Sequence, residues 1–144
     1  MTAPVPAYRN VIQFPVRFGD LDAMGHVNNV RFLAYFEEGR VAWFREVLGM
    51  APESYAYPVV VARVEIDFLA SIGFGREVRV GTRCARIGGK SLLIEGEIQV
   101  ASTPPQVASR YKCTLVYVDA QSGQSISVPE ADRKRITTYE PGLS

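Results

Sequence analysis

The stretch Arg17–Arg40, RFGDLDAMGHVNNVRFLAYFEEGR, decides how the rest of the chain is interpreted. Its first half carries two aspartates, Asp20 and Asp22, and the only histidine of the chain, His26. Glycine and aspartate clustered at this density predict a loop over residues 19–27. An apolar pattern with helical spacing follows at once. The sequence therefore places several polar side chains against the start of one helix.

This helix is predicted to begin at Asn28 or Asn29 and to end near Leu48, where Gly49 stops it. Asn28 suits the N-cap position, and capping alone would explain its presence. Apolar residues separated by three or four positions, or by sums of these, predict the buried face, which comprises Val30, Leu33, Val41, Phe44 and Leu48.

Two residues interrupt the helical pattern. Glu37 is the one charged residue on the predicted buried face, so it must pair with Arg40 or Arg63, or face a cavity. A structural ion pair is the simpler alternative for this glutamate. Gly39 costs about 1 kcal/mol relative to alanine inside a helix, and close packing of a sheet against the helix would explain it.

The other regular segments of the sequence are expected to be strands. They cover residues 10–18 before the helix, and 59–69, 77–87, 91–100 and 106–119 after it. The segment RIGGK predicts a hairpin between the third and fourth of them. One long helix with a mostly antiparallel sheet of five or six strands is an α+β layout. Since one helix covers only one face of the sheet, an oligomer is expected.

Length and composition limit the expected number of domains, binding partners, cellular location and cofactors. The 144 residues are expected to form one domain over 1–144, with 1–9 and 137–144 peripheral. A net charge of +1 gives no electrostatic reason to expect nucleic acid or a membrane as partner. No signal peptide, membrane span or disulfide framework is indicated, so a cytoplasmic location is expected. One histidine and two distant cysteines leave zinc short of ligands, and no metal or other cofactor is expected.

The motif D-x-D-x-x-G-H-V-N-N, ahead of a helix containing Y-F-E, resembles the hot-dog-fold acyl-CoA thioesterases of the 4-hydroxybenzoyl-CoA thioesterase type. The resemblance continues through VARVEIDFLASIGFGREVRV, IGGKSLLIEGEI and LVYVD, and so covers about 11–133. It implies a long central helix wrapped by a curved antiparallel sheet. It also implies homodimers or homotetramers with active sites between subunits, which hydrolyse an acyl- or aroyl-CoA thioester to the free acid and coenzyme A.

The resemblance assigns roles to the residues of the loop. The catalytic carboxylate falls on Asp22, and the backbone amide that polarises the thioester carbonyl falls on Asn29. Gly25 allows the close backbone turn, while His26 and Asn28 orient the loop or touch the thioester. Whether Asp22 acts as base or as nucleophile stays open.

Further positions follow from the same resemblance. Lys90 and Ser91 match the region that meets coenzyme A, and Phe32 stands where relatives often carry tyrosine, so the acyl pocket is expected to differ. Glu37 lies eight residues past the polarising amide, where other hot-dog thioesterases place their carboxylate. Asp22 is the favoured catalytic group, with Glu37 as the alternative. Other cations considered for the coenzyme A phosphates are Arg86, Arg133, Lys134 and Arg135.

Elementary chemistry agrees with these assignments. Thioester hydrolysis needs a carboxylate that acts on water or on the carbonyl carbon. It also needs a donor for the oxyanion that develops, and a helix N-terminus offers free N–H groups and a partial positive charge. The chemistry therefore suits a loop carboxylate beside a helix start.

Two other functions remain open from the sequence. A hydratase or dehydratase on the same fold pairs a histidine with a carboxylate, although the D-x-N-x-x-H pattern of such enzymes is missing. A non-catalytic acyl-CoA-binding protein would bind without turnover. The acyl group, and the choice between coenzyme A and a carrier protein, are not determined; the aromatic residues expected near the pocket are Phe32, Tyr35, Phe36, Tyr55, Tyr57 and Phe68.

Overall fold

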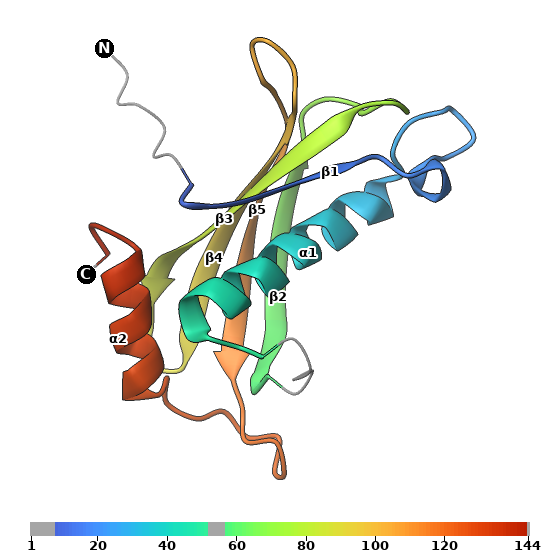
Figure 1. Cartoon of the computed structure of the whole chain (residues 1–144). Helices are drawn as coiled ribbons and strands as arrows, with labels where there is room; N and C mark the ends of the chain where they lie inside the picture. The colour runs from blue at the N-terminus through green and yellow to red at the C-terminus, as the bar shows by residue number, and fades with distance from the viewer. Residues whose placement is uncertain (1–7, 52–56, 144) are drawn as a thin grey trace.

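The computed structural model describes residues 8–51 and 57–143, so Tyr55 lies outside the described part. Helix α1 (Asn29–Leu48) lies across the inner face of a curved antiparallel sheet (Figure 1). The strands are β1 (Asn10–Pro15), β2 (Val59–Phe68), β3 (Glu77–Ile87), β4 (Ser91–Val100) and β5 (Gln106–Tyr117). Their order across the sheet is β1-β3-β4-β5-β2. The predicted α+β architecture is confirmed, with five strands.

Strand β1 is shorter than the prediction of 10–18. It ends at Pro15, on an edge of the sheet, and a 3-10 turn, η1 (Phe18–Asp20), follows. The Asp20 side chain accepts the Arg17 amide at 3.1 Å, and the Asp20 amide donates to the Arg17 carbonyl at 2.9 Å. These local hydrogen bonds compete with strand pairing, which is why the strand gives way to a turn here.

The ends of α1 match the prediction, but its buried face does not. Asn28 caps the first turn by accepting the Val30 amide at 3.0 Å, and Gly49 closes the helix in the left-handed conformation, with φ of 66°. Val30 is 70% exposed and Leu33 is 40% exposed, so the prediction of the buried face is wrong for its first two residues. The residues that the helix buries are Phe32, Tyr35, Phe36, Gly39, Trp43, Phe44, Val47 and Leu48. Aromatic rings bury more area than valine, so they decide which face turns inward.

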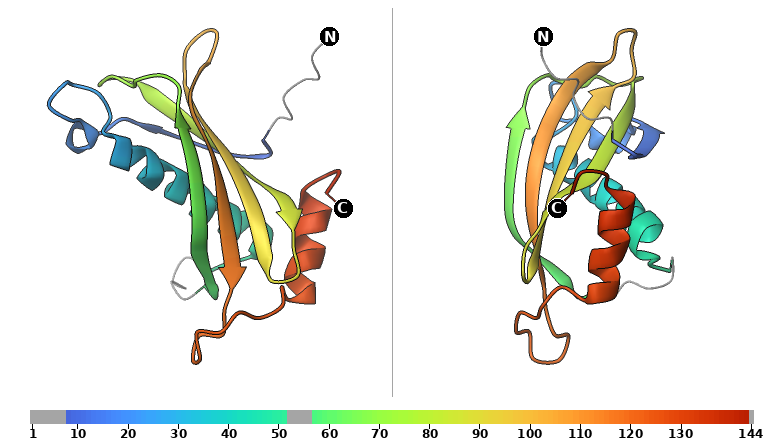
Figure 2. Two further views of the ribbon diagram at one scale, coloured as in Figure 1. Left: turned by 180° about the vertical axis from the view of Figure 1, so that it is seen from behind. Right: turned by 90° about the vertical axis from the view of Figure 1, so that its left-hand side faces the viewer.

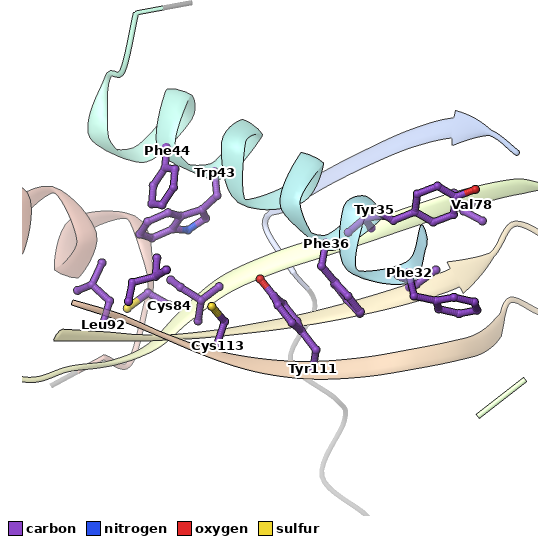
Figure 3. Packing of buried hydrophobic residues seen from close by; sticks show 14 of the residues in the cluster. Phe32, Tyr35, Phe36, Trp43, Phe44, Val78, Cys84, Leu92, Tyr111 and Cys113 are labelled. Atoms are coloured by element: carbon purple, nitrogen blue, oxygen red, sulfur yellow. The ribbon is translucent and has the colours of Figure 1, made fainter. Parts of the chain in front are cut away.

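The space between α1 and the sheet is filled by aromatic side chains (Figure 3). The rings of Phe36 and Tyr111 stack with centroids 3.9 Å apart. Where the sheet comes closest, a Cβ atom on Gly39 would lie 2.6 Å from Thr82 Oγ1 and 2.9 Å from Val80 Cγ1. The prediction that close packing explains Gly39 is confirmed.

A second helix, α2 (Glu130–Tyr139), follows the sheet near the C-terminus. It packs beside the C-terminal end of α1 (Figure 2), where the Arg135 guanidinium donates to the Leu48 carbonyl at 2.7 Å. Although residues 137–144 are expected to be peripheral, Glu140 is only 6% exposed and its carboxylate accepts the Cys84 amide. The helix thus ties the remote end of α1 to β3.

Candidate active site

The loop before α1 forms a small hairpin. Leu21 and Val27 pair as an antiparallel bridge, and the Asp22 amide donates to the His26 carbonyl at 2.8 Å. Gly25 has φ of 78°, in the left-handed region that glycine tolerates, so it allows the tight turn expected of it.

The base of this hairpin joins the helix start. The Asn28 amide donates to the Asp20 carbonyl at 2.9 Å, one pair beyond the bridge between Leu21 and Val27. Asn28 also caps α1 through its side chain. The loop and the first helical turn therefore share one hydrogen-bonded junction.

Asp22 lies exposed at the turn of the hairpin. Its Oδ1 accepts the backbone amides of Met24 at 2.9 Å and His26 at 3.2 Å. Among the described residues, Oδ2 accepts no hydrogen bond. One oxygen therefore holds the side chain in place, while the other can contact a substrate or a water molecule.

Asp20 performs a different task from Asp22, which the sequence did not reveal. It is 7% exposed, and its Oδ2 accepts the Tyr35 hydroxyl at 2.7 Å. Its Oδ1 lies 3.8 Å from Arg31 Nε. Burial, and then the hydrogen bond to Asp20, raise the pKa of Tyr35 well above its ordinary value. The carboxylate of Asp20 thus fixes the hairpin to the second turn of the helix, in addition to accepting the Arg17 amide within the loop.

The start of α1 offers a free backbone donor. The Val30 amide is bound by the Asn28 side chain, and the Arg31 amide donates to the Asn28 carbonyl at 2.8 Å. Within the described part of the chain, the Asn29 amide donates to no partner. The helix dipole adds partial positive charge at this point, so the Asn29 N–H is suited to stabilise an oxyanion.

The alternative carboxylate, Glu37, lies outside this junction. It stands eight residues beyond Asn29 along the helix, which corresponds to about 12 Å at 1.5 Å per residue. Its side chain is 71% exposed and lies 3.8 Å from Arg40 Nη2. The predicted partner Arg40 is present. The expectation that Glu37 lies on the buried face is wrong within one protomer, because its side chain lies on the outer side of the helix while Phe36 beside it is buried.

The remaining predicted residues divide between the two ends of the helix. Phe32 is buried and packs edge-on against Phe68, with ring centroids 5.3 Å apart. Lys90 and Ser91 lie at the β3–β4 hairpin, which α2 contacts through Arg133 to the Gly88 carbonyl at 3.0 Å. This hairpin is therefore at the end of α1 opposite the loop (Figure 1). A helix of 20 residues is about 30 Å long, so one protomer does not bring Lys90 and Asp22 together.

Neither a metal-binding cluster nor a membrane-spanning helix is found in the described residues. Among residues 8–51 and 57–143, no group of three or more His, Cys, Asp or Glu side chains could hold a metal ion. No helix in that same part is long and apolar enough to cross a membrane.

Comparison with known proteins assigns the class. A thioesterase from Thermus thermophilus, solved in complex with coenzyme A and Zn, is 34% identical, with a TM-score of 0.83 over 95% of this chain and 99% of that one. A 4-hydroxybenzoyl-CoA thioesterase variant complexed with 4-hydroxybenzoyl-CoA has a TM-score of 0.78 over 88% of this chain and 97% of that one. Its identity of 15% shows only a shared fold. The curved sheet around one long helix is the hot-dog fold of these enzymes.

Sequence comparison then gives the family. The family model of the Thioesterase-like superfamily matches residues 16–136, and the chain belongs to that superfamily. The uncharacterized protein YsmA of Bacillus subtilis (strain 168) is 28% identical over 121 residues, which cover 84% of this chain and 80% of that protein. The family resemblance seen in the loop motif is thereby confirmed.

Proposed function

We propose that this protein hydrolyses acyl-CoA thioesters to a free acid and coenzyme A, with Asp22 as the catalytic carboxylate. One observation carries the proposal: within the described residues, the hairpin leaves Oδ2 of Asp22 free, and the helix start that the hairpin joins leaves the Asn29 N–H unpaired. The coenzyme A bound to the similar Thermus thermophilus thioesterase supports this choice of substrate.

The chemistry follows from these two groups. Asp22 Oδ2 accepts a proton from water as the water oxygen attacks the thioester carbon. The carbonyl oxygen becomes an oxyanion and accepts a hydrogen bond from the Asn29 N–H, a contribution of about 10²–10³ in rate in well-studied hydrolases. The C–S bond then breaks, and coenzyme A leaves as the thiolate. Direct attack by Asp22 on the carbonyl carbon is the alternative order of events, with water then cleaving the resulting anhydride.

The proposal includes a homodimer or homotetramer whose active site lies between subunits. Edge strand β2 exposes Val60, Val61 and Val64, and the outer face of α1 exposes Val30 and Leu33. An unpaired apolar edge strand invites pairing with another chain. A second subunit would also bring its Lys90 and Ser91 region to the Asp22 loop, because these two regions lie at opposite ends of α1 in one protomer. The interface is expected to bury more than about 1,000 Å² of accessible surface. A monomer in sedimentation at micromolar concentration that keeps full activity in kinetic assays would contradict the proposed oligomer.

The decisive experiment replaces the carboxylate while keeping its hydrogen bonds. Asp22→Asn is expected to lower kcat at least about 10²-fold, because the amide cannot accept the proton. Asp119→Asn is the matched control, since its Oδ1 likewise accepts two backbone amides, those of Gln121 at 2.9 Å and Ser122 at 2.8 Å. The control should retain full activity, and Glu37→Gln should lose far less than Asp22→Asn.

The assay follows thiol release from short, medium, long and aromatic acyl-CoA substrates. An active Asp22→Asn enzyme with an inactive but folded Glu37→Gln would transfer the catalytic role to the helix. Loss of conjugated-alkene absorbance from an enoyl-CoA without thiol release would identify a hydratase instead. Saturable binding without turnover would identify a binding protein. A cytoplasmic location stays a prediction.

A further inference from the structure

Beside the Asp22 hairpin lies a polar hollow of about 220 Å³ that the proposed reaction does not use. Three connections at this end of the sheet border this open hollow: the loop before α1, the β2–β3 connection and the β4–β5 turn. The lining residues are His26, Ser71, Ile72, Gly73, Arg76, Val100, Ser102 and Gln106. Side chains far apart in the sequence thus meet around one small space.

The lining is rich in hydrogen-bond donors. The Arg76 guanidinium carries a fixed positive charge, and none of the lining residues is acidic. Within the described part of the chain, the Arg76 side chain, the His26 ring and the Gln106 amide make no hydrogen bond or ion pair. The Ser102 hydroxyl, in contrast, already donates to the Pro104 carbonyl at 2.8 Å. A positive, donor-rich hollow with no acidic residue in its lining favours an anion.

Its size restricts the anion. Pockets for drug-sized ligands occupy about 300–1,000 Å³. The smaller hollow suits a single phosphate group or a short carboxylate rather than a whole nucleotide. We propose that it binds a small oxyanion, held by Arg76 with His26 and Gln106 as further donors.

The site touches the catalytic loop through His26. The His26 amide donates to Asp22 Oδ1 at 3.2 Å, and the His26 carbonyl accepts the Asp22 amide at 2.8 Å. His26 also pairs with Gly73, which lines the hollow. An anion on the His26 ring is therefore bound to the same residue that holds the proposed catalytic carboxylate. Binding itself does not depend on the proposed activity.

The single histidine provides the test. The imidazole signals of His26 in a proton–carbon NMR spectrum are followed while inorganic phosphate, or acetate, replaces chloride at constant pH and ionic strength. A saturable shift is expected, and Arg76→Gln should weaken the binding at least about tenfold, because a charge-assisted hydrogen bond is lost. The matched control is Arg79→Gln, which removes an exposed cation of β3 outside the hollow and should leave the affinity unchanged.

Each outcome decides the proposal. Saturation by phosphate alone identifies a phosphoryl group as ligand, and saturation by acetate alone identifies a carboxylate, such as that of an acid product. A shift that never saturates, or one that Arg76→Gln and Arg79→Gln change equally, overturns the site. Gln106→Ala serves as a second variant if Arg76→Gln does not fold, and it too should weaken binding.

Discussion

Removal of the Tyr35 hydroxyl should weaken both the fold and the proposed catalysis. Tyr35→Phe keeps the ring, which packs edge-on against Phe14 with centroids 4.9 Å apart, and deletes only the 2.7 Å hydrogen bond to Asp20. A buried hydrogen bond to a charged group contributes about 1.5–3 kcal/mol, so the free energy of unfolding should fall by about that amount. Asp20 still accepts a hydrogen bond from the Arg17 amide in this variant, which limits the loss of stability.

Activity should fall for a separate reason. The Asp20 carboxylate fixes the hairpin that carries Asp22 to the helix that carries the Asn29 amide. A misplacement of about 1 Å can cost about 10²-fold in rate, so kcat for acyl-CoA should drop by up to about 10²-fold while KM changes little.

The matched control is Tyr57→Phe, at the opposite end of α1. Its hydroxyl donates to Asp132 at 3.1 Å, so the variant loses a comparable hydrogen bond far from the loop. Urea unfolding at fixed protein concentration and initial rates are measured for both variants. A Tyr35→Phe variant as stable as the parent, or a Tyr57→Phe variant that loses kcat to the same extent, would contradict this role of Asp20.

Three further predictions concern other regions. Gly39→Ala should lower the free energy of unfolding by about 1 kcal/mol. Overpacking against the fully buried Thr82 and Val80 costs about 1–3 kcal/mol, which outweighs a helix-propensity gain of about 1 kcal/mol. Denaturant midpoints equal to the parent's would contradict this. Burial raises the pKa of Glu140 above its ordinary value of 4.5, so its contribution to stability is present below that pH and is lost as pH rises through the folded-state pKa. Unfolding curves for Glu140→Gln should lack this decline, and identical pH profiles for variant and parent would refute it. Lys90→Gln should raise KM for acyl-CoA more than it lowers kcat, since contacts with coenzyme A phosphates stabilise substrate and transition state alike; an unchanged KM would remove Lys90 from the site.

The sequence predicted those parts of the fold that depend on local patterns. Strands β3 and β4 match their predicted bounds because apolar and polar residues alternate throughout them. The ends of α1 match because Asn28 and Gly49 are local signals for a cap and a stop. The buried face of α1 was misassigned, since spacing alone gives Val30 the same weight as Trp43.

The arrangement of the site could be predicted only in part. Asp22 and Gly25 lie in the hairpin and Asn29 lies in the helical turn that the hairpin joins, as their closeness in the chain requires, while their roles stay predictions. The contact between Asp20 and Tyr35 joins a loop to the inner face of a helix, and no local sequence pattern predicts it. The separation of Lys90 from the loop depends on the path of the whole sheet, which residue spacing does not contain.

The stacked rings of Phe36 and Tyr111 have a consequence for how such a protein can evolve. They occupy the interior between α1 and the sheet, so an acyl chain cannot pass there without displacing them. The residues that specify the packed interior are thus a different set from those that α1 exposes. Val30 and Leu33, on the exposed side of the same helix, can vary without disturbing the interior. Substitutions on that exposed side can therefore accumulate one at a time while the packed interior, and with it the fold, stays unchanged.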